Sequence, residues 1–290
     1  MICEKMNIRI PALGKKQVMA NFPERPRDSH KGLFGTVAVI GGANGMTGAP
    51  LLAARAALKL GAGCVHVGLL AENAPGVDAL QPELMLHSAK AALQLPGVDV
   101  FAIGCGIGTL IAAQKLLYEA LKRNAALVLD ADALNLLAKH ADLQDDLRSR
   151  KQPTVLTPHP GEAARLLACS TKEIQAGRVA AARDLSHKFA CSVVLKGADS
   201  LCATRDGKLF VNKTGNPGMS SAGMGDVLTG MIAALIAQGM TADNAMLLAV
   251  HLHGAAGDAL AEQGITIGMT AGDVTEWARW LLNQWTQPAA

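Results

Sequence analysis

The chain has 290 residues, of which 50% are hydrophobic and 18% are charged. A chain this apolar can bury enough surface to offset the entropy lost on folding, which excludes intrinsic disorder, and its length fits one large domain or two small ones. The net charge is only +3 with no dense basic run, and 3% of the residues are aromatic, so binding of nucleic acid through a basic patch or base stacking is disfavoured.

Short apolar runs rich in β-branched residues alternate with stretches rich in alanine and leucine. We expect strands over residues 36–40, 64–68, 98–103, 126–129, 154–156 and 191–195, with the first helix over 49–60. Nearly continuous apolar strands separated by helices indicate a mainly parallel sheet covered by helices on both faces, which is an α/β fold. Residues 203–211 predict a hairpin that turns at Asp206-Gly207, and residues 226–261 predict two helices divided at Gly239.

No internal repeat and no linker rich in proline, glycine or serine divides the sequence. We therefore expect a single domain over residues 1–290, in which residues 1–30 form an irregular arm rich in proline and charge. The longest weakly polar runs, 101–113 and 228–237, are shorter than the roughly 20 residues of a membrane span. The N-terminus lacks the apolar region of a signal peptide and the six cysteines contain no CxxC pair, so we expect reduced thiols in the cytoplasm.

Ligands of open parallel sheets bind at the carboxyl ends of the strands, and five predicted strand or hairpin ends carry unusual residues. Two of these are the glycine loops 41–48 and 104–108. Glycines let backbone N–H groups approach an anion at a helix N-terminus. Neither loop matches a Walker A motif or the strict dinucleotide fingerprint, so a tight structural turn explains each of them equally well.

Two further strand ends carry charged side chains. In Thr157-Pro-His-Pro-Gly-Glu162, the two prolines could hold His159 and Glu162 at the edge of the sheet, although a rigid turn that caps the next helix is the alternative. The segment Lys196-Gly-Ala-Asp-Ser200 places a cation and small polar residues directly after a strand. That arrangement suits phosphate contacts, although turns from a strand into a hairpin often look similar.

The segment 216–230 is the most informative. Gly223, Met224 and Gly225 open a predicted helix, so their backbone N–H groups can form an anion hole. Asp226 can accept a proton from a hydroxyl group as a phosphoryl group is delivered to it, and the helix dipole is expected to favour its ionised form. A helix cap is the alternative, but the glycines crowded around this one acid exceed what a cap requires.

Other polar residues give weaker signals. Asp130 and Asp132 could orient a cation or a ligand, although Asp132 could simply cap the following helix. His251 and His253 are two residues apart on a predicted helix, so they face different directions and cannot jointly hold a metal. No Gly-x-Ser-x-Gly element supports a serine hydrolase. We assign no metal ligands to the chain.

Together, these segments resemble the ADP/ATP-dependent NAD(P)H-hydrate dehydratase family of ribokinase-like proteins. The Gly-x-Gly-Asp motif is shared with many ribokinase-like kinases, whereas the combination TPHPGE, KGADS and NPGMSSAGMGDVLTG is much more specific. The resemblance runs from about Pro11 to the C-terminus and includes residues 30–32, 129–137 and 268–273. Ser220-Ser221 departs from the family pattern, where alanine followed by serine or threonine is expected, and this bears on the shape of the donor pocket.

The resemblance implies a repair reaction. ADP or ATP phosphorylates the ring hydroxyl of the S epimer of hydrated NADH or NADPH, and elimination of phosphate regenerates the coenzyme. It implies that Asp226 is the base and that Gly223, Met224 and Gly225 form the anion hole. The implied contacts to the nucleotide are Lys196, Gly197, Ala198, Asp199, Ser200 and Gly225. The implied contacts to the hydrate are Ala49, Gly106, Gly108, His159 and Asp226.

The resemblance also implies that Mg²⁺ bridges the phosphates and that the protein forms a homotetramer. Many relatives carry an epimerase domain upstream, which this sequence lacks. Two alternatives stay open from the residues: a ribokinase-like vitamin kinase, acting on hydroxyethylthiazole or a pyrimidine, and a nucleotide-binding regulatory protein without turnover. The intact Asp226 with its glycines disfavours the second. The sequence does not discriminate ADP from ATP, or NADH hydrate from NADPH hydrate.

Overall fold

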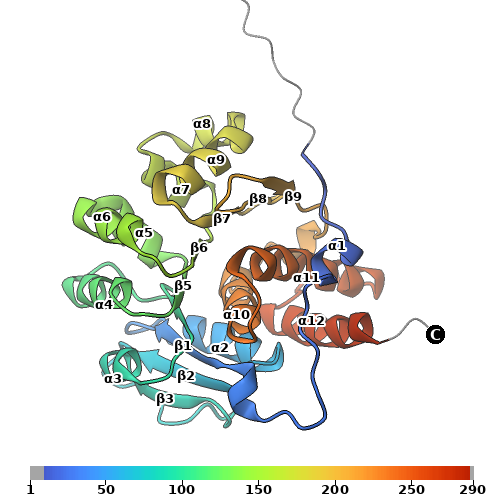
Figure 1. The fold of residues 1–290 in the computed structure, drawn as a ribbon, viewed down its shortest axis with the longest axis horizontal. Coiled ribbons are helices and arrows are strands. Elements are labelled where there is room, and N and C mark those ends of the chain that lie inside the picture. Colours follow the sequence, from blue (N-terminus) through green and yellow to red (C-terminus); the bar gives the residue numbers. More distant parts are fainter. Residues whose placement is uncertain (1–9, 288–290) are drawn as a thin grey trace, which may run out of the picture.

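The computed structural model describes residues 10–287, whose strands form one nine-stranded sheet in the order β3-β2-β1-β4-β5-β6-β7-β8-β9 (Figure 1). Strands β1 to β7 run parallel, and β8 and β9 are antiparallel to their neighbours. The strands are β1 (Thr36–Gly41), β2 (Cys64–Leu69), β3 (Met85–Ser88), β4 (Val100–Ile103), β5 (Ala126–Leu129), β6 (Thr154–Leu156), β7 (Ser192–Leu195), β8 (Leu201–Ala203) and β9 (Leu209–Val211).

Helices cover both faces of the sheet (Figure 1). One layer contains α1 (Lys15–Met19), α2 (Gly48–Lys59), α10 (Met224–Ala237), α11 (Ala242–Glu262) and α12 (Ala271–Thr286). The other contains α3 (Ala89–Gln94), α4 (Ile111–Leu121), α5 (Asp132–Lys139), α6 (Ala141–Ser149), α7 (Pro160–Leu167), α8 (Thr171–Ala176) and α9 (Arg178–Phe189). Two short 3₁₀ helices are η1 (Lys31–Phe34) and η2 (Pro217–Met219).

Alternate side chains of each central strand enter the two cores. On β1, Val37 and Val39 pack under the layer with α10, whereas Ala38 and Ile40 pack under the layer with α3 and α4. All four are fully buried, which explains why the sequence reads as a continuous apolar run rather than an alternating one.

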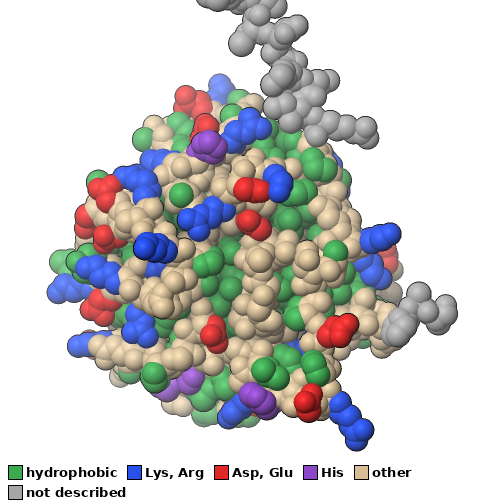
Figure 2. Space-filling model, viewed as in Figure 1, with side chains coloured by type: hydrophobic (Ala, Val, Ile, Leu, Met, Phe, Trp, Pro, Cys, Tyr) green, Lys and Arg blue, Asp and Glu red, His purple; other side chains and the backbone are tan. Residues whose placement is uncertain are grey.

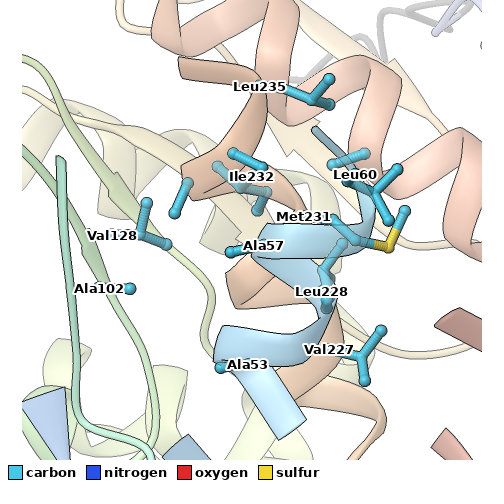
Figure 3. Packing of buried hydrophobic residues seen from close by; sticks show 14 of the residues in the cluster. Ala53, Ala57, Leu60, Ala102, Val128, Val227, Leu228, Met231, Ile232 and Leu235 are labelled. Carbon is cyan, nitrogen blue, oxygen red and sulfur yellow. The ribbon is translucent and has the colours of Figure 1, made fainter. Parts of the chain in front are cut away.

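Helices α2 and α10 pack unusually closely, as Figure 3 shows for the small side chains of Ala53 and Ala57 facing α10. A Cβ atom on Gly230 would lie 1.9 Å from the backbone oxygen of Ala53, so only glycine fits at this crossing. The buried side chains of Val227, Leu228 and Ile232 complete the contact. This packing fixes α10 against the sheet and therefore fixes where its N-terminus points.

The predicted strands are confirmed to within two residues at their ends, as is the hairpin of β8 and β9. Strand β3 was missed, because it is a four-residue, partly exposed edge strand with little apolar signal. The prediction of an irregular arm over residues 1–30 is only partly right. Helix α1 forms within it, and a bridge between Ala12 and Val211 attaches it to β9, while residues 1–9 lie outside the described range.

Charged side chains of both signs are spread over the visible surface (Figure 2). Lys, Arg, Asp and Glu side chains are interspersed on the face seen in Figure 2. Within residues 10–287, no helix combines the length and the apolar character that crossing a bilayer would require.

Candidate active site

The loops after β1 and β4 lie together at the carboxyl end of the sheet. The amide of Gly42 donates to the Cys105 carbonyl at 3.1 Å, and that of Ala43 donates to the Gly106 carbonyl at 2.7 Å. From β1 the chain proceeds to β2 on one side and later returns to β4 on the other, so the order of strands reverses here. Such a reversal opens the crevice in which open α/β sheets bind ligands.

The N-terminus of α10 presents free backbone N–H groups. Its N-cap residue, Gly223, has a φ of 89°, a left-handed conformation that favours glycine, and a Cβ atom there would lie 2.6 Å from the Cδ1 atom of Leu52. No side chain caps the helix. The first N–H groups of a helix have no partner within it, so Met224 and Gly225 can offer theirs to an anion, and the anion hole stays a prediction.

Asp226 lies in the first turn of α10, three positions after the N-cap, and it forms no capping box. The capping alternative therefore does not explain it. The helix dipole was expected to favour its ionised form, but burial, with the nearby Asp130 carboxylate, raises the pKa of Asp226 to about 6. The Cys105 thiol and Lys196 oppose this shift. Asp226 is therefore mostly ionised at neutral pH, while holding a proton more tightly than an ordinary aspartate.

A buried ion pair supports the start of α10. Lys196 Nζ lies 2.7 Å from Asp130 Oδ1, and the hydroxyl of Thr229 donates to Asp130 Oδ2 at 3.0 Å. Burial alone would raise the pKa of Asp130, which is 1% exposed, but Lys196 holds it below its usual value. A Cβ atom on Gly225 would lie 3.2 Å from Lys196 Nζ and 3.3 Å from Asp130 Oδ2, so glycine gives the ion pair its room.

His159 and Glu162 form the cap of α7 that the sequence offered as the alternative. The Nδ1 atom of His159 accepts from the amide of Gly161 at 3.0 Å, and Glu162 Oε2 accepts from the His159 amide at 2.8 Å. The side chain of Glu162 also lies 4.0 Å from Lys196 Nζ, which joins this cap to the ion pair. Burial raises the pKa of Glu162 to about 7, and burial lowers that of His159.

A cavity of about 540 Å³ opens beside the N-terminus of α10. The structure brings all six residues predicted to bind the nucleotide into its wall: Lys196, Gly197, Ala198, Asp199, Ser200 and Gly225. The loop from Asn212 to Ser220 and the side chain of His253 on α11 line it as well. Ser220, part of the departure from the family pattern, belongs to this wall, whereas the Ser221 hydroxyl donates to the Met269 carbonyl at 2.9 Å.

Arg178, the first residue of α9, holds the turn of residues 196–200 from behind. Its guanidinium donates to the backbone carbonyls of Leu195 at 3.2 Å, Lys196 at 3.3 Å and Asp199 at 3.4 Å. Asp199 has a φ of 54°, which is uncommon for a residue other than glycine, and its carboxylate pairs with Lys213 at 2.6 Å. A strained turn persists only where its surroundings fix it, and Arg178 and Lys213 do so here.

Three of the residues predicted to bind the hydrate, Ala49, Gly106 and Gly108, lie at the start of α2 and in the loop after β4. A Cβ atom on Gly106 would lie 3.4 Å from the Cβ of Ala49, and the Gly108 amide donates to Asp132 at 2.9 Å. Cys105, in the same loop, contacts Asp226. The structure thus brings Ala49 and Gly106 together next to Cys105, the residue that contacts Asp226. Ala49, Gly106, Gly108 and His159 are all outside the wall of the cavity, and His159 lies near Lys196.

Sequence reasoning missed several residues of this site. Cys105 looked like a small buried thiol, although its place inside a glycine loop at a strand end was a signal. Arg178 gave no signal, because its role depends on carbonyls 17 to 21 positions away. The Asp130–Lys196 pair spans 66 positions, and only the position of each residue after a strand suggested that they meet.

Comparisons with known proteins identify the family of this chain. A model of the NAD(P)H-hydrate dehydratase family matches residues 37–278. The ADP-dependent (S)-NAD(P)H-hydrate dehydratase of Neisseria meningitidis is 44% identical over 92% of this chain and 91% of its own length. The bifunctional NAD(P)H-hydrate repair enzyme of Coxiella burnetii is 42% identical over 92% of this chain, but the chain spans only 54% of that relative's length.

Solved structures confirm the predicted ribokinase-like α/β fold. The ADP/ATP-dependent NAD(P)H-hydrate dehydratase of Bacillus subtilis, co-crystallized with ATP and Mg²⁺, superposes with a TM-score of 0.84 at 28% identity, covering 96% of this chain and 99% of that chain. A hydroxyethylthiazole kinase from Pyrococcus horikoshii reaches a TM-score of 0.61 at 17% identity, covering 92% of this chain and 91% of that chain, and so shares the fold alone. The match over most of the chain and the 44% identity place this protein in the NAD(P)H-hydrate dehydratase family.

Proposed function

We propose that this protein is an ADP-dependent (S)-NAD(P)H-hydrate dehydratase, a lyase that repairs hydrated NADH and NADPH. The observation that carries the proposal is the position of Asp226, in the first turn of an uncapped helix between a nucleotide-sized cavity and two glycine loops. A cavity of this volume lies within the range of about 300–1,000 Å³ that small-molecule sites occupy.

In the first step, the carboxylate of Asp226 removes the proton of the ring hydroxyl. The hydroxyl oxygen then forms a bond to the terminal phosphorus of the donor, and the bond between that phosphorus and the bridging oxygen breaks, so that ADP leaves AMP. Backbone N–H groups of Gly223, Met224 and Gly225 face the negative charge that develops on the phosphoryl oxygens. Each of these groups is fixed before the reaction, so no reorganisation is needed as charge develops.

In the second step, the bond between the ring carbon and the phosphate oxygen breaks, and phosphate leaves with the bonding electrons. The neighbouring ring carbon loses its proton to the departing phosphate, and the electrons of that C–H bond restore the ring double bond and regenerate the reduced coenzyme. The anion hole that served phosphoryl transfer is positioned to stabilise the departing phosphate as well.

Lys196 would supply charge at the donor phosphates while it stays paired with Asp130. In the structure, its ammonium group lies between Asp130 and Glu162, and the residue also lines the cavity. Burial would lower its pKa, but the two carboxylates raise it above the usual value, so the ammonium is charged at neutral pH. The amides of the turn 197–200 add neutral hydrogen-bond donors beside it.

We propose that a Mg²⁺ ion would be held mainly by the donor phosphates. Both oxygens of Asp130 already have partners, and residues 10–287 contain no group of three or more His, Cys, Asp and Glu side chains placed to hold a metal. Mg²⁺ usually keeps several waters and binds substrate phosphates with few protein ligands. When bound, it would neutralise charge on the phosphates.

The proposal extends to ATP as an alternative donor, to a homotetramer, and to a partner activity that interconverts the hydrate epimers. The names of the bifunctional relatives support the last point, since this chain covers about half of their length. Exposed apolar side chains such as Leu80 and Ile267 supply surface that subunit contacts could cover. Sedimentation equilibrium tests the tetramer.

One assay tests the activity. Purified protein is incubated with the S epimer of NADH hydrate, ADP and Mg²⁺, and the absorbance of reduced nicotinamide is followed together with release of phosphate. Recovery of absorbance with one phosphate per coenzyme supports the dehydratase. A stable phosphorylated alcohol from a thiazole or pyrimidine substrate, without recovery of coenzyme, would instead support the vitamin kinase.

A further inference from the structure

Two carboxylates share the ammonium group of Lys196, and they hold it unequally. Asp130 Oδ1 lies 2.7 Å from Lys196 Nζ, and the Thr229 hydroxyl donates to the other oxygen of Asp130. Glu162 Oε2 lies 4.0 Å from Lys196 Nζ, which is outside hydrogen-bond distance. Asp130 therefore has the tighter hold on the ammonium, and Glu162 is the carboxylate that an incoming anion can more easily replace.

Glu162 is also the carboxylate that takes a proton more readily. Its side chain is 5% exposed, and burial raises its pKa to about 7, with Asp130 adding to the shift. Lys196, the amide of His159 and the guanidinium of Arg165 oppose this rise. The pKa of Asp130 is instead lowered, because Lys196 more than offsets burial there. Near neutral pH, Glu162 therefore lies between its two protonation states, whereas Asp130 stays ionised.

We propose that Glu162 takes up a proton from the solvent when a nucleotide binds with its phosphates beside Lys196. The inference rests on the proposed function, because it takes a nucleoside diphosphate as the occupant of the cavity. Lys196 lines that cavity and its side chain is 20% exposed, so an anion can reach it. A bound phosphate competes with Glu162 for the ammonium and adds negative charge nearby, and both effects favour the neutral acid.

This linkage makes the affinity for ADP depend on pH with a definite sign. Ionised Glu162 repels the phosphates and protonated Glu162 does not, so the affinity falls as pH rises above about 7. If bound phosphates strengthen the hold of Glu162 on its proton about tenfold, ADP binding takes up about half a proton at pH 7.5 and weakens roughly fivefold between pH 7 and pH 9. Asp226, with a pKa of about 6, and His159, whose pKa burial lowers, have largely lost their protons by pH 7.5.

Calorimetric titration of ADP measures this uptake when it is repeated in buffers with different heats of ionisation. Glu162→Gln is the test variant. A capping box accepts glutamine at its third helical position, so the cap of α7 is kept, and the neutral amide mimics the protonated acid. We expect this variant to lose the proton uptake, to keep its ADP affinity above pH 7, and to bind ADP up to about tenfold more tightly than the wild type at pH 9.

Glu173→Gln is the matched control. Glu173 has the same position in the capping box of α8, but it is exposed and lies outside the wall of the cavity. This variant should keep the proton uptake and the pH dependence of the wild type. The inference is overturned if the wild type takes up no proton at pH 7.5, or if Glu162→Gln takes up as much as the wild type. If the wild type binds no ADP, the proposed function fails instead, and calorimetry alone distinguishes the two failures.

Discussion

Replacing Asp226 with asparagine separates catalysis from folding. The amide keeps the size of the side chain at the third position of α10 but cannot take the proton of the ring hydroxyl. General-base catalysis contributes roughly 10²- to 10⁴-fold, so we expect a loss of that size in kcat with little change in KM for either substrate. Because the anion hole consists of backbone groups, binding of ADP should persist.

The raised pKa gives the same variant a second signature. A carboxyl group whose pKa is higher in the folded protein contributes stability below its unfolded pKa of 3.8 and loses it as pH rises through about 6. An asparagine side chain does not ionise, so the variant does not lose this stability as pH rises. We therefore expect Asp226→Asn to be more stable than the wild type at pH 8, by at most about 3 kcal/mol. At pH 4 the difference should nearly vanish.

Two measurements check this. The wild-type pH profile of kcat/KM should fall on the acid side near pH 6, reaching about one-tenth at pH 5. Urea unfolding of both proteins at pH 4 and pH 8 gives the difference in stability. Turnover of Asp226→Asn close to that of the wild type would refute the assignment of the base. A variant that is less stable than the wild type at pH 8 would refute the account of the buried carboxylate.

Three further substitutions address the supporting residues. Lys196→Ala should weaken ADP binding by about 1.5–3 kcal/mol, with hydrate binding nearly intact, and should also destabilise the fold by leaving Asp130 buried and unpaired. Adding Asp130→Asn to Lys196→Ala should restore stability but not ADP affinity. If calorimetry shows that Lys196→Ala binds ADP as tightly as the wild type, Lys196 is not part of the nucleotide site. Arg178→Lys should raise KM for ADP several-fold and leave KM for the hydrate unchanged, because Arg178 holds the turn of residues 196–200 through its backbone carbonyls. Arg183→Lys on the same helix is the control and should leave both values unchanged. Equal effects of the two substitutions would contradict this role of Arg178. His159→Asn keeps a side chain that can cap α7 and should raise KM for the hydrate more than that for ADP, whereas the reverse pattern would exchange the two pockets.

The sequence predicts those features of the site that depend on residues close together in the chain, and misses those that depend on distant residues. The glycines around Asp226 predict an anion hole, because helix geometry alone leaves the first N–H groups without a hydrogen-bond partner in the helix. Local sequence also suggested both possibilities for His159, a ligand contact and a cap, and the structure shows the cap. Asp226 is mostly ionised at neutral pH, as the sequence predicted. Burial and the charge of Asp130, which belongs to another strand end, nevertheless raise its pKa to about 6, and no local signal indicated this shift.

Pairings between distant strand ends lie beyond such reasoning. The partner of Lys196 is fixed by the order in which strands enter the sheet, since β5 and β7 are separated only by β6. Arg178 acts through backbone carbonyls, which every residue carries, so no side-chain pattern marks its targets. Residues of this kind are found only when the topology places their elements together.

The geometry also explains why the Gly-x-Gly-Asp motif marks the fold family more than the substrate. Gly223 is needed for its left-handed backbone and its contact with Leu52, and Gly225 leaves room for the Lys196–Asp130 ion pair, which would crowd an added Cβ atom at 3.2 to 3.3 Å. Both requirements build an anion hole beside an acid, and any phosphoryl transfer to a hydroxyl can use that arrangement. Discrimination among hydroxyl substrates must come from elsewhere. The loop after β4, whose Cys105 contacts Asp226, and the β1 loop bonded to it lie outside the wall of the proposed donor cavity. Exchanging these loops should therefore change which hydroxyl is phosphorylated while leaving the affinity for ADP intact.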